Sequence, residues 1–500
     1  MSRATEERKE TKIEKGKIRR KVLQVGTLAA KLYGSMLDHR IDGWAEASGI
    51  RAKDDWDAEL KAASEAPDDE SDKFDFPNLA GEDLRSLMYA DDLMQAATSI
   101  DGLRKQMALL EDFSARWGLT INASKTKVMV FSRLNSPHVA KTAVLKIGGE
   151  VVEVVERFKY LGTIFHCSQM LSRHAVPARA YNGRRAYHIS RRRLAELQLG
   201  GGLEINFRLF DVMVDSVLGY GAEVWAPELL CNDPLSNDCE RVHLFALKWL
   251  LGVRKSTASC IVLAETGRWP LAFRWVKRIA RFYNGLVKAP ADSILKRAFI
   301  ANCQLTSNPA EGSAKCMAEQ SWAAQLQRAF KKFEVQLPLE EPIELNVNDV
   351  CIKWKEFYLN RVRTETGTKI KKYVHEVRNG LLEYEAAPYL GVSAVQERRA
   401  VIQAMTGSHF LMEEVGRWSQ LAKEDRVCKQ CAEKEIKNVE TAEHMFFHCP
   451  NYDDIRADFP CLDFTITNLH EFSNEQPTQL ASFIKKCFVR HRELNPLSRR

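Results

Sequence analysis

Two adjacent aspartates, Asp91 and Asp92, follow the short apolar run Leu87–Ala90. An apolar strand that ends in a tight turn would hold both carboxylates at its tip. Mg²⁺ prefers carboxylate oxygens and nucleotide phosphates as ligands, and pairs of such ions activate and stabilise the oxygens in phosphoryl transfer. Paired acids at a strand end are also common in solvated turns. The pair alone is therefore compatible with either a magnesium site or an ordinary turn.

A second group of candidate ligands lies near the other end of the chain. Cys428 and Cys431 are separated by two residues, and His444 and Cys449 follow as a second pair. Two close pairs separated by a loop are the layout of a structural Zn²⁺ site, and thiolate and imidazole ligands favour zinc over harder metals. His448 is a rival for the histidine position. Coincidence is the alternative, because the chain contains twelve cysteines, most of them isolated.

Positive charge is concentrated in a few stretches of the chain. The net charge is +7 and the isoelectric point is about 8.7, which is only mildly basic. Residues 173–193, however, are rich in arginine and contain no acid, whereas residues 54–75 are strongly acidic. Local basic stretches suit a polyanion such as nucleic acid. For any single stretch, a solvated helix face is the alternative.

Three segments follow the aspartate pair in a characteristic order. They are Gly118–Asn122, Lys125–Lys127 and Phe158–Gly162, the last reading Phe-Lys-Tyr-Leu-Gly. Together with Tyr89–Asp92 they resemble the back half of the reverse transcriptase of non-LTR (LINE-type) retrotransposons. The resemblance extends through Leu218–Trp225 to the cysteine and histidine cluster, which is similar to the zinc knuckle that many of these elements carry. An aromatic strand and a surface lysine cluster in an unrelated sheet are the alternative.

The resemblance implies RNA-directed DNA polymerase chemistry and assigns roles to individual residues. Asp91 and Asp92 would be catalytic and would bind Mg²⁺, and Lys125 would lie near the nucleotide. Zn²⁺ would be held by Cys428, Cys431, His444 and Cys449. The partners implied are an RNA template, a DNA primer or target, the RNA–DNA duplex and deoxynucleotides. The residues expected to contact nucleic acid are Gln24, Tyr89, Lys159, Tyr160, Gly162, Arg179, Arg184, Arg185, Arg191 and Arg192.

Toward the N-terminus the sequence departs from the family pattern. Residues Lys21–Tyr33 resemble a motif that supports the incoming nucleotide, but Val25 stands at a glycine position, where a side chain would obstruct close backbone approach. The family's third catalytic aspartate belongs several tens of residues earlier, and residues 1–20 contain no aspartate. We therefore expect an N-terminally truncated polymerase that does not synthesise DNA unaided. The alternatives are a non-catalytic RNA- or DNA-binding protein derived from such an element, and a decaying remnant.

The patterns predict an α+β fold: a partial reverse-transcriptase palm, a mostly α-helical thumb and connector, and a small zinc-knuckle-like element. The expected divisions, in order, are a degenerate motif remnant at 1–50, an acidic insert at 51–80, the palm remnant at 81–168, a helical thumb at 169–300, a helical connector at 301–420, the zinc element at 421–460 and a basic tail at 461–500.

The spacing of apolar residues gives the local elements. Alternation or apolar runs predict hairpins at 83–93 and 144–155 and a strand within 122–133. Helical spacing predicts helices at 29–44 and 101–117, and helical character up to Leu286 and again at 321–333 and 350–399. Polar breaks are expected at 304–315 and 335–349.

The compartment is expected to be intracellular. The first twenty residues are charged and do not resemble a signal peptide, and no apolar stretch approaches the roughly 20 residues that span a bilayer. Scattered free cysteines suit a reducing environment. A nuclear or a cytoplasmic location is compatible with the sequence, and action on target DNA would require the nucleus.

Overall fold

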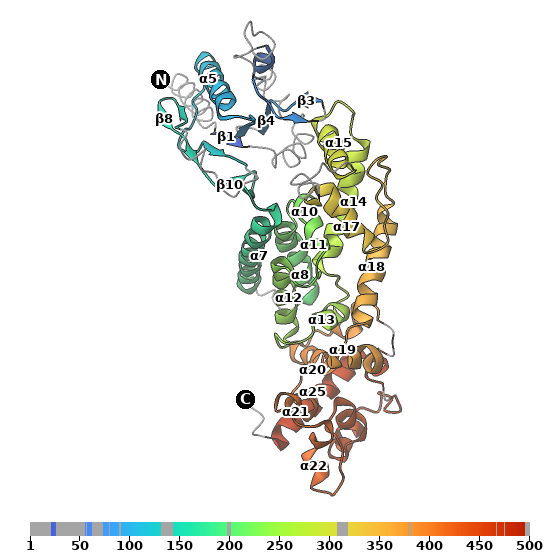
Figure 1. The fold of residues 1–500 in the computed structure, drawn as a ribbon. Helices are drawn as coiled ribbons and strands as arrows, with labels where there is room; N and C mark the ends of the chain where they lie inside the picture. The colour runs from blue at the N-terminus through green and yellow to red at the C-terminus, as the bar shows by residue number, and fades with distance from the viewer. Residues whose placement is uncertain are drawn as a thin grey trace, which may run out of the picture. The chain divides into compact units, whose positions relative to one another are not determined.

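The computed structural model combines strands and helices, which confirms the mixed α and β class (Figure 1). The chain divides into two compact units, each built from three segments. The first unit contains 1–178, 221–231 and 278–347, and the second contains 179–220, 232–277 and 348–500. The residues that the structure describes are 22–26, 56, 58–62, 74–79, 81–89, 92–131, 144–197, 202–307, 319–378, 380, 382–466, 468–474 and 476–495.

The first unit contains a five-stranded sheet (Figure 1). Strands β4 and β5 form an antiparallel hairpin, and β5 then pairs in parallel with β1. Strand β1 also pairs in parallel with β6, and β6 with β9. The order across the sheet is β4 (Ser86–Tyr89), β5 (Asp92–Gln95), β1 (Val22–Gly26), β6 (Lys127–Met129) and β9 (Glu153–Val154).

Helix α5 (Ile100–Arg116) supplies much of the core of this unit. Its apolar side chains Leu103, Met107, Leu110 and Phe113 recur every three or four residues and are all buried. Ser99 caps the helix by accepting a hydrogen bond from the Gly102 backbone N–H at 3.0 Å. The predicted helix at 101–117 is therefore confirmed.

Three short hairpins complete the strands of the first unit. They are β2 (Asn78–Leu79) with β3 (Glu82–Asp83), β7 (Lys146–Ile147) with β8 (Glu150–Val151), and β10 (Arg157–Tyr160) with β11 (Thr163–His166). Gly148 and Gly149 both have positive φ, as a two-residue turn between right-twisted strands requires. The predicted hairpin at 144–155 is confirmed up to Val151. The strand is interrupted at Val152, and the next strand, β9, pairs with β6 instead of with β7.

Helices form the rest of both units. Helices α7 (Leu171–Glu196), α14 (Leu271–Lys288) and α18 (Val347–Arg363) each cross a unit boundary in sequence. The first unit also contains α10 (Ala222–Trp225), α11 (Pro227–Leu230), α15 (Ile294–Ser307) and α17 (Trp322–Lys331). The main helices of the second are α8 (Leu203–Leu209), η3 (Phe210–Asp215), α9 (Ser216–Leu218), α12 (Asp238–Leu251), α13 (Ser259–Glu265), α19 (Thr368–Lys371), η4 (Lys372–Val377), α20 (Val395–Met405), α21 (Met412–Trp418), α24 (Leu469–Asn474) and α25 (Pro477–Leu494).

Two helical expectations need correction, and one lies outside the described residues. Helix α15 runs to Ser307, past the start of the polar break expected at 304, because Leu295, Phe299 and Cys303 form a buried stripe at helical spacing. The region 350–399 is not one continuous helical stretch: among the described residues between η4 and α20, the helical element is the 3₁₀ turn η5 (Pro388–Gly391). The helix expected at 29–44 falls outside the described residues. None of the described helices is both long and apolar enough to cross a membrane.

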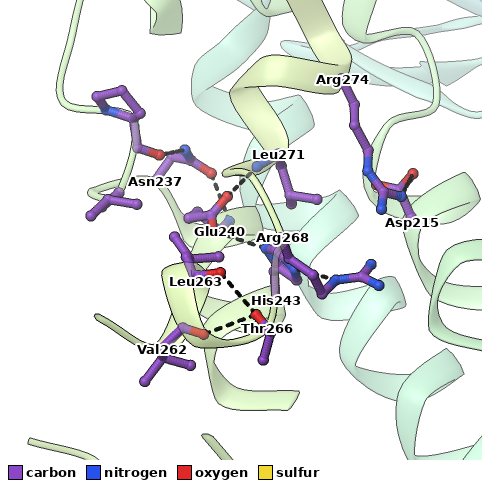
Figure 2. Close-up of polar contacts among 12 residues, drawn as sticks. Asp215, Asn237, Glu240, His243, Val262, Leu263, Thr266, Arg268, Leu271 and Arg274 are labelled. Atoms are coloured by element: carbon purple, nitrogen blue, oxygen red, sulfur yellow. Dashed lines mark hydrogen bonds and ion pairs between the residues drawn. The ribbon is translucent and has the colours of Figure 1, made fainter. Parts of the chain in front are cut away.

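A polar network centred on the buried Glu240 and His243 joins three helices of the second unit (Figure 2). On α12, the Glu240 carboxylate accepts hydrogen bonds from the Leu271 backbone N–H at 2.6 Å and pairs with the His243 ring at 2.9 Å. Arg268 donates to the other ring nitrogen of His243 at 3.4 Å and also pairs with Asp211. Although burial opposes it, pairing with Arg268 and Arg274 lowers the pKa of Asp211. The network fixes α12 against η3 and the start of α14.

Gly183 on α7 marks a close approach of this helix to α9. A Cβ atom at this position would lie 2.3 Å from the Leu218 Cδ2 atom, and Leu218 is buried. Gly183→Val is therefore expected to destabilise the second unit by about 1–3 kcal/mol through overpacking. Thermal unfolding followed by circular dichroism measures this, with Asn182→Val, at the neighbouring exposed position, as the control. An unchanged melting temperature in Gly183→Val would contradict the packing described here.

Candidate functional site

The hairpin of β4 and β5 positions the predicted catalytic carboxylates. Tyr89, the last residue of β4, is the partner of Asp92, the first residue of β5, in the antiparallel register. Asp92 is half-buried at the first position of β5, and Tyr89 is half-buried at the last position of β4. Ala90 and Asp91 themselves lie outside the described residues. The apolar run before them is short and strand-forming, which explains why the sequence predicted a hairpin here.

Lys125 precedes strand β6, which pairs with β1, the strand that also pairs with β5. Val22 of β1 is the partner of Asp92, and three residues later Val25 of β1 is the partner of Val128 of β6. Lys125 is exposed and lies two residues before β6, in a turn where its backbone N–H donates to the Asn122 carbonyl at 3.2 Å. Strand β1 contains Gln24, so this predicted contact lies on a central strand, and its side chain falls outside the described part of the structure.

The second hairpin, β10 with β11, turns through Leu161 and Gly162. Both residues have positive φ, 44° and 78°, so the glycine occupies a position that other residues adopt only with strain. Lys159 is exposed on β10. Tyr160, in contrast, is only 4% exposed and packs in a cluster with Leu87 and other apolar residues of the sheet. Its ring therefore anchors the hairpin to the sheet.

Helix α7 has one exposed basic face. Arg184, Arg185 and Arg192 are exposed on it, and Arg191 lies at its border with the guanidinium 3.2 Å from the centre of the Trp249 ring. Arg179 differs from the other four predicted arginines because it is only 8% exposed and its guanidinium stacks 4.3 Å from the centre of the Tyr220 ring. Burial on the opposite helix face removes Arg179 from the basic surface.

Sequence reasoning missed two aromatic residues beside this face. Phe245 and Trp249 lie one helical turn apart on α12 and are 37% and 43% exposed. The Phe245 ring lies 6.0 Å from the Tyr187 ring and 6.4 Å from the His188 ring of α7. Burial raises the pKa of Tyr187 to about 12, with Arg191 opposing the shift, so Tyr187 is a neutral core residue. The sequence did contain a signal for these two rings: Arg241, Phe245 and Trp249 recur every four residues, which places them on one face of a helix.

The four predicted zinc ligands converge in the second unit. The ligand atoms of Cys428, Cys431, His444 and Cys449 all lie within 4.8 Å of one another, and all four residues are buried. The Cys431 Sγ atom is 3.6 Å from the Cys449 Sγ atom and 3.4 Å from the His444 Nε2 atom. A tetrahedral zinc ion with ordinary bond lengths separates its sulfur ligands by about 3.8 Å and sulfur from nitrogen by about 3.5 Å. The residues therefore fit Zn²⁺.

The surroundings of the cluster hold these ligands in place. The Asn451 amide donates to the Cys449 Sγ atom at 3.5 Å, and the Cys428 backbone N–H donates to the Asn438 carbonyl at 2.8 Å. A hydrogen bond from Cys428 is the main cause that lowers the pKa of the Cys449 thiol, despite burial. A thiolate is the form that binds a metal. His448, the rival ligand, is exposed and is not part of the cluster.

The end of the sheet near Asp92 fits a two-metal centre less well. Strands β4 and β1 flank β5, and their sequences, Ser-Leu-Met-Tyr and Val-Leu-Gln-Val-Gly, contain no carboxylate. Among the described residues, Asp92 is not part of any group of three metal-ligating side chains. The hairpin alone therefore supplies at most two adjacent carboxylates, and we derive no catalytic step through Mg²⁺.

Comparison with known proteins agrees with the geometry of the first unit. Residues 64–165 match the family model of the reverse transcriptase (RNA-dependent DNA polymerase). The match contains the β4–β5 hairpin, helix α5, strand β6 and nearly all of the β10–β11 hairpin. No curated protein matches the chain.

Proposed function

We propose that this chain is the reverse transcriptase polypeptide of a non-LTR retrotransposon. The register of β4 and β5 supports the proposal, because it pairs Tyr89 with Asp92 at the adjoining ends of two antiparallel strands, within the segment that matches the reverse transcriptase family. In this role Asp91 and Asp92 are the catalytic carboxylates. Lys125 lies near the nucleotide, and Tyr89 contacts nucleic acid at the hairpin.

The remaining parts have supporting roles in the same proposal. The β10–β11 hairpin holds the primer end through Lys159 and the turn at Gly162, and Tyr160 anchors it from below. Gln24 on β1 supports the template. The sheet is the palm, the helices that begin with α7 are the thumb and connector, and the zinc cluster organises the end of the chain. RNA template, DNA primer and deoxynucleotides are the partners.

The chain is further proposed not to polymerise DNA unaided. Two metal ions need more ligands than two adjacent carboxylates provide, and the strands that flank β5 supply none. A second candidate function follows from this observation: a non-catalytic protein that binds RNA and DNA. The exposed arginines of α7 and the buried cysteine and histidine cluster favour it, since neither depends on the aspartates.

Both candidates require binding to an RNA–DNA duplex through α7. An exposed row of arginines can follow the phosphates of an A-like duplex by shape, and each phosphate contact releases a counterion. The double variant Arg184→Ala, Arg185→Ala is therefore expected to weaken hybrid binding and to reduce the slope of log K against log salt by about 1.5–2. Fluorescence anisotropy from 50 to 300 mM salt measures both.

The matched control changes two adjacent basic residues elsewhere, Arg104→Ala and Lys105→Ala on α5. This variant is expected to leave the affinity and the salt slope close to those of the unaltered chain. Equal losses in both variants would show that the effect follows net charge. An unchanged slope in the α7 variant would remove this helix from the interface.

A further inference from the structure

Helices α7 and α12 expose an aromatic and basic ridge in the second unit. The helices run side by side in the same direction, because residues 187 and 188 meet Phe245 and residue 191 meets Trp249. The exposed ridge residues are Tyr181, Arg184, Arg185, His188, Arg192, Arg241, Phe245 and Trp249.

Exposing a large aromatic ring to water is unfavourable unless a partner covers it. The ridge exposes three such rings, Tyr181, Phe245 and Trp249. Tyr181 is 65% exposed, and the Arg185 guanidinium lies 5.8 Å from the centre of its ring. The Arg191 guanidinium covers Trp249 at 3.2 Å. Exposed aromatic rings joined to guanidinium groups mark interaction surfaces rather than ordinary solvated helix faces.

The chemistry of the ridge narrows the class of partner. Arg185 and Arg191 lie against exposed rings, and Arg184, Arg192 and Arg241 are exposed on the same ridge. Two nearby acids offset part of this charge, because Glu196 pairs with Arg192 and Arg193, and Asp238 pairs with Arg241. Positive charge remains in excess. This charge selects a polyanion. A duplex exposes its phosphates, but its bases are stacked on one another, so they cannot stack on the aromatic side chains. A single strand offers both phosphates and free base faces, which stack on aromatic residues and on arginine planes.

We infer that the α7–α12 ridge binds a single-stranded segment of nucleic acid, with unpaired bases stacked on Phe245 and Trp249 and phosphates on Arg184, Arg185 and Arg192. The inference rests on the proposed function, since a reverse transcriptase handles template that has not yet paired. The arginines of α7 would then contact phosphates of duplex and single strand alike, and Phe245 and Trp249 would add stacking positions for unpaired bases. Ribose and deoxyribose strands share this chemistry, and the experiment compares the two.

The test measures binding of the full chain to three fluorescent probes: an unstructured 20-nucleotide RNA, the DNA of the same sequence, and the RNA–DNA hybrid. Trp249→Ala and Phe245→Ala are each expected to weaken single-strand binding by about 5- to 150-fold, the usual range for one stacked base. Hybrid binding is expected to change less than about twofold. Trp249→Phe keeps a ring face and should retain most of the affinity, whereas Trp249→Leu should not.

Trp117→Ala, which removes an exposed tryptophan of the first unit, is the matched control and should leave all three affinities unchanged. Circular dichroism establishes that each variant is folded. Equal loss of single-strand and hybrid binding, or retention of affinity by Trp249→Leu, would overturn the stacking inference while leaving the proposed function intact. If the unaltered chain bound none of the probes, the proposed function would fall as well.

Discussion

Cys449→Ser is expected to abolish zinc binding and to unfold the segment around residues 428–449. Three cysteines and one histidine converge at zinc-like separations in a buried site. Small elements of this kind take most of their folding free energy from the metal, about 10–16 kcal/mol in isolated zinc-finger peptides. Loss of one ligand opens the tetrahedron and leaves two thiols and an imidazole buried without the ion that pairs them.

Elemental analysis of the purified chain measures the metal, and limited proteolysis measures the folding of the segment. The unaltered chain should contain about one zinc per molecule, and Cys449→Ser should contain almost none and be cut within residues 428–449. Two controls are matched to the two ligand types. Cys461→Ala, at an exposed cysteine, and His448→Ala, at the exposed rival histidine, should both keep the metal. Zinc loss in His448→Ala but not in His444→Ala would contradict the ligand set.

Glu265→Ala is expected to lower the stability of the second unit by about 3–5 kcal/mol, the usual cost of breaking a buried ion pair. Glu265 is fully buried at the end of α13. The Arg378 Nη2 atom lies 2.8 Å from its carboxylate, and the hydroxyls of Tyr373 and Tyr389 also donate to it. The substitution leaves one buried guanidinium and two buried hydroxyls without their acceptor.

Thermal unfolding is the measurement for this variant. A loss of this size corresponds to roughly 2–4 °C for each kcal/mol in a domain of about 150–250 residues. Glu385→Ala removes an exposed carboxylate from the same region and is expected to change the melting temperature by less than about 1 °C, because exposed positions contribute little. A melting temperature equal to that of the control would show that Glu265 does not join α13 to η4 as described.

Local patterns in the sequence predicted the parts of the molecule that depend on short spacing. The hairpin predicted at 83–93 is present with shifted bounds, 86–95, because Asp83 pairs with Asn78 instead. Helix α5 follows from its apolar spacing, and the cysteine and histidine cluster follows from its paired ligands. Each of these features is determined by residues that lie within a few tens of positions of one another in the sequence. The mixed α and β class, which needs only the order of such segments, is also confirmed by the structure.

Features that depend on tertiary packing could not be predicted in the same way. Arg179 and Arg184 look alike in the sequence, but the helix turns one toward Tyr220 and the other toward solvent. Tyr160 looked like a ligand contact, yet it packs under the β10–β11 hairpin. The aromatic ridge requires α7 and α12 to lie side by side, although they are separated along the chain, so no single stretch of sequence indicates it.

The central claim is that this chain binds an RNA–DNA primer–template as a reverse transcriptase polypeptide but does not extend the primer by itself. Primer extension on an RNA template with Mg²⁺ tests it most directly, with binding measured on the same labelled hybrid. The comparison is with the double variant Asp91→Ala, Asp92→Ala. We expect both proteins to bind the hybrid, and we expect neither to add nucleotides. Extension by the unaltered chain that disappears in the double variant would contradict this account, because it would require a complete metal site in this chain, and failure to bind the hybrid would contradict the proposed function.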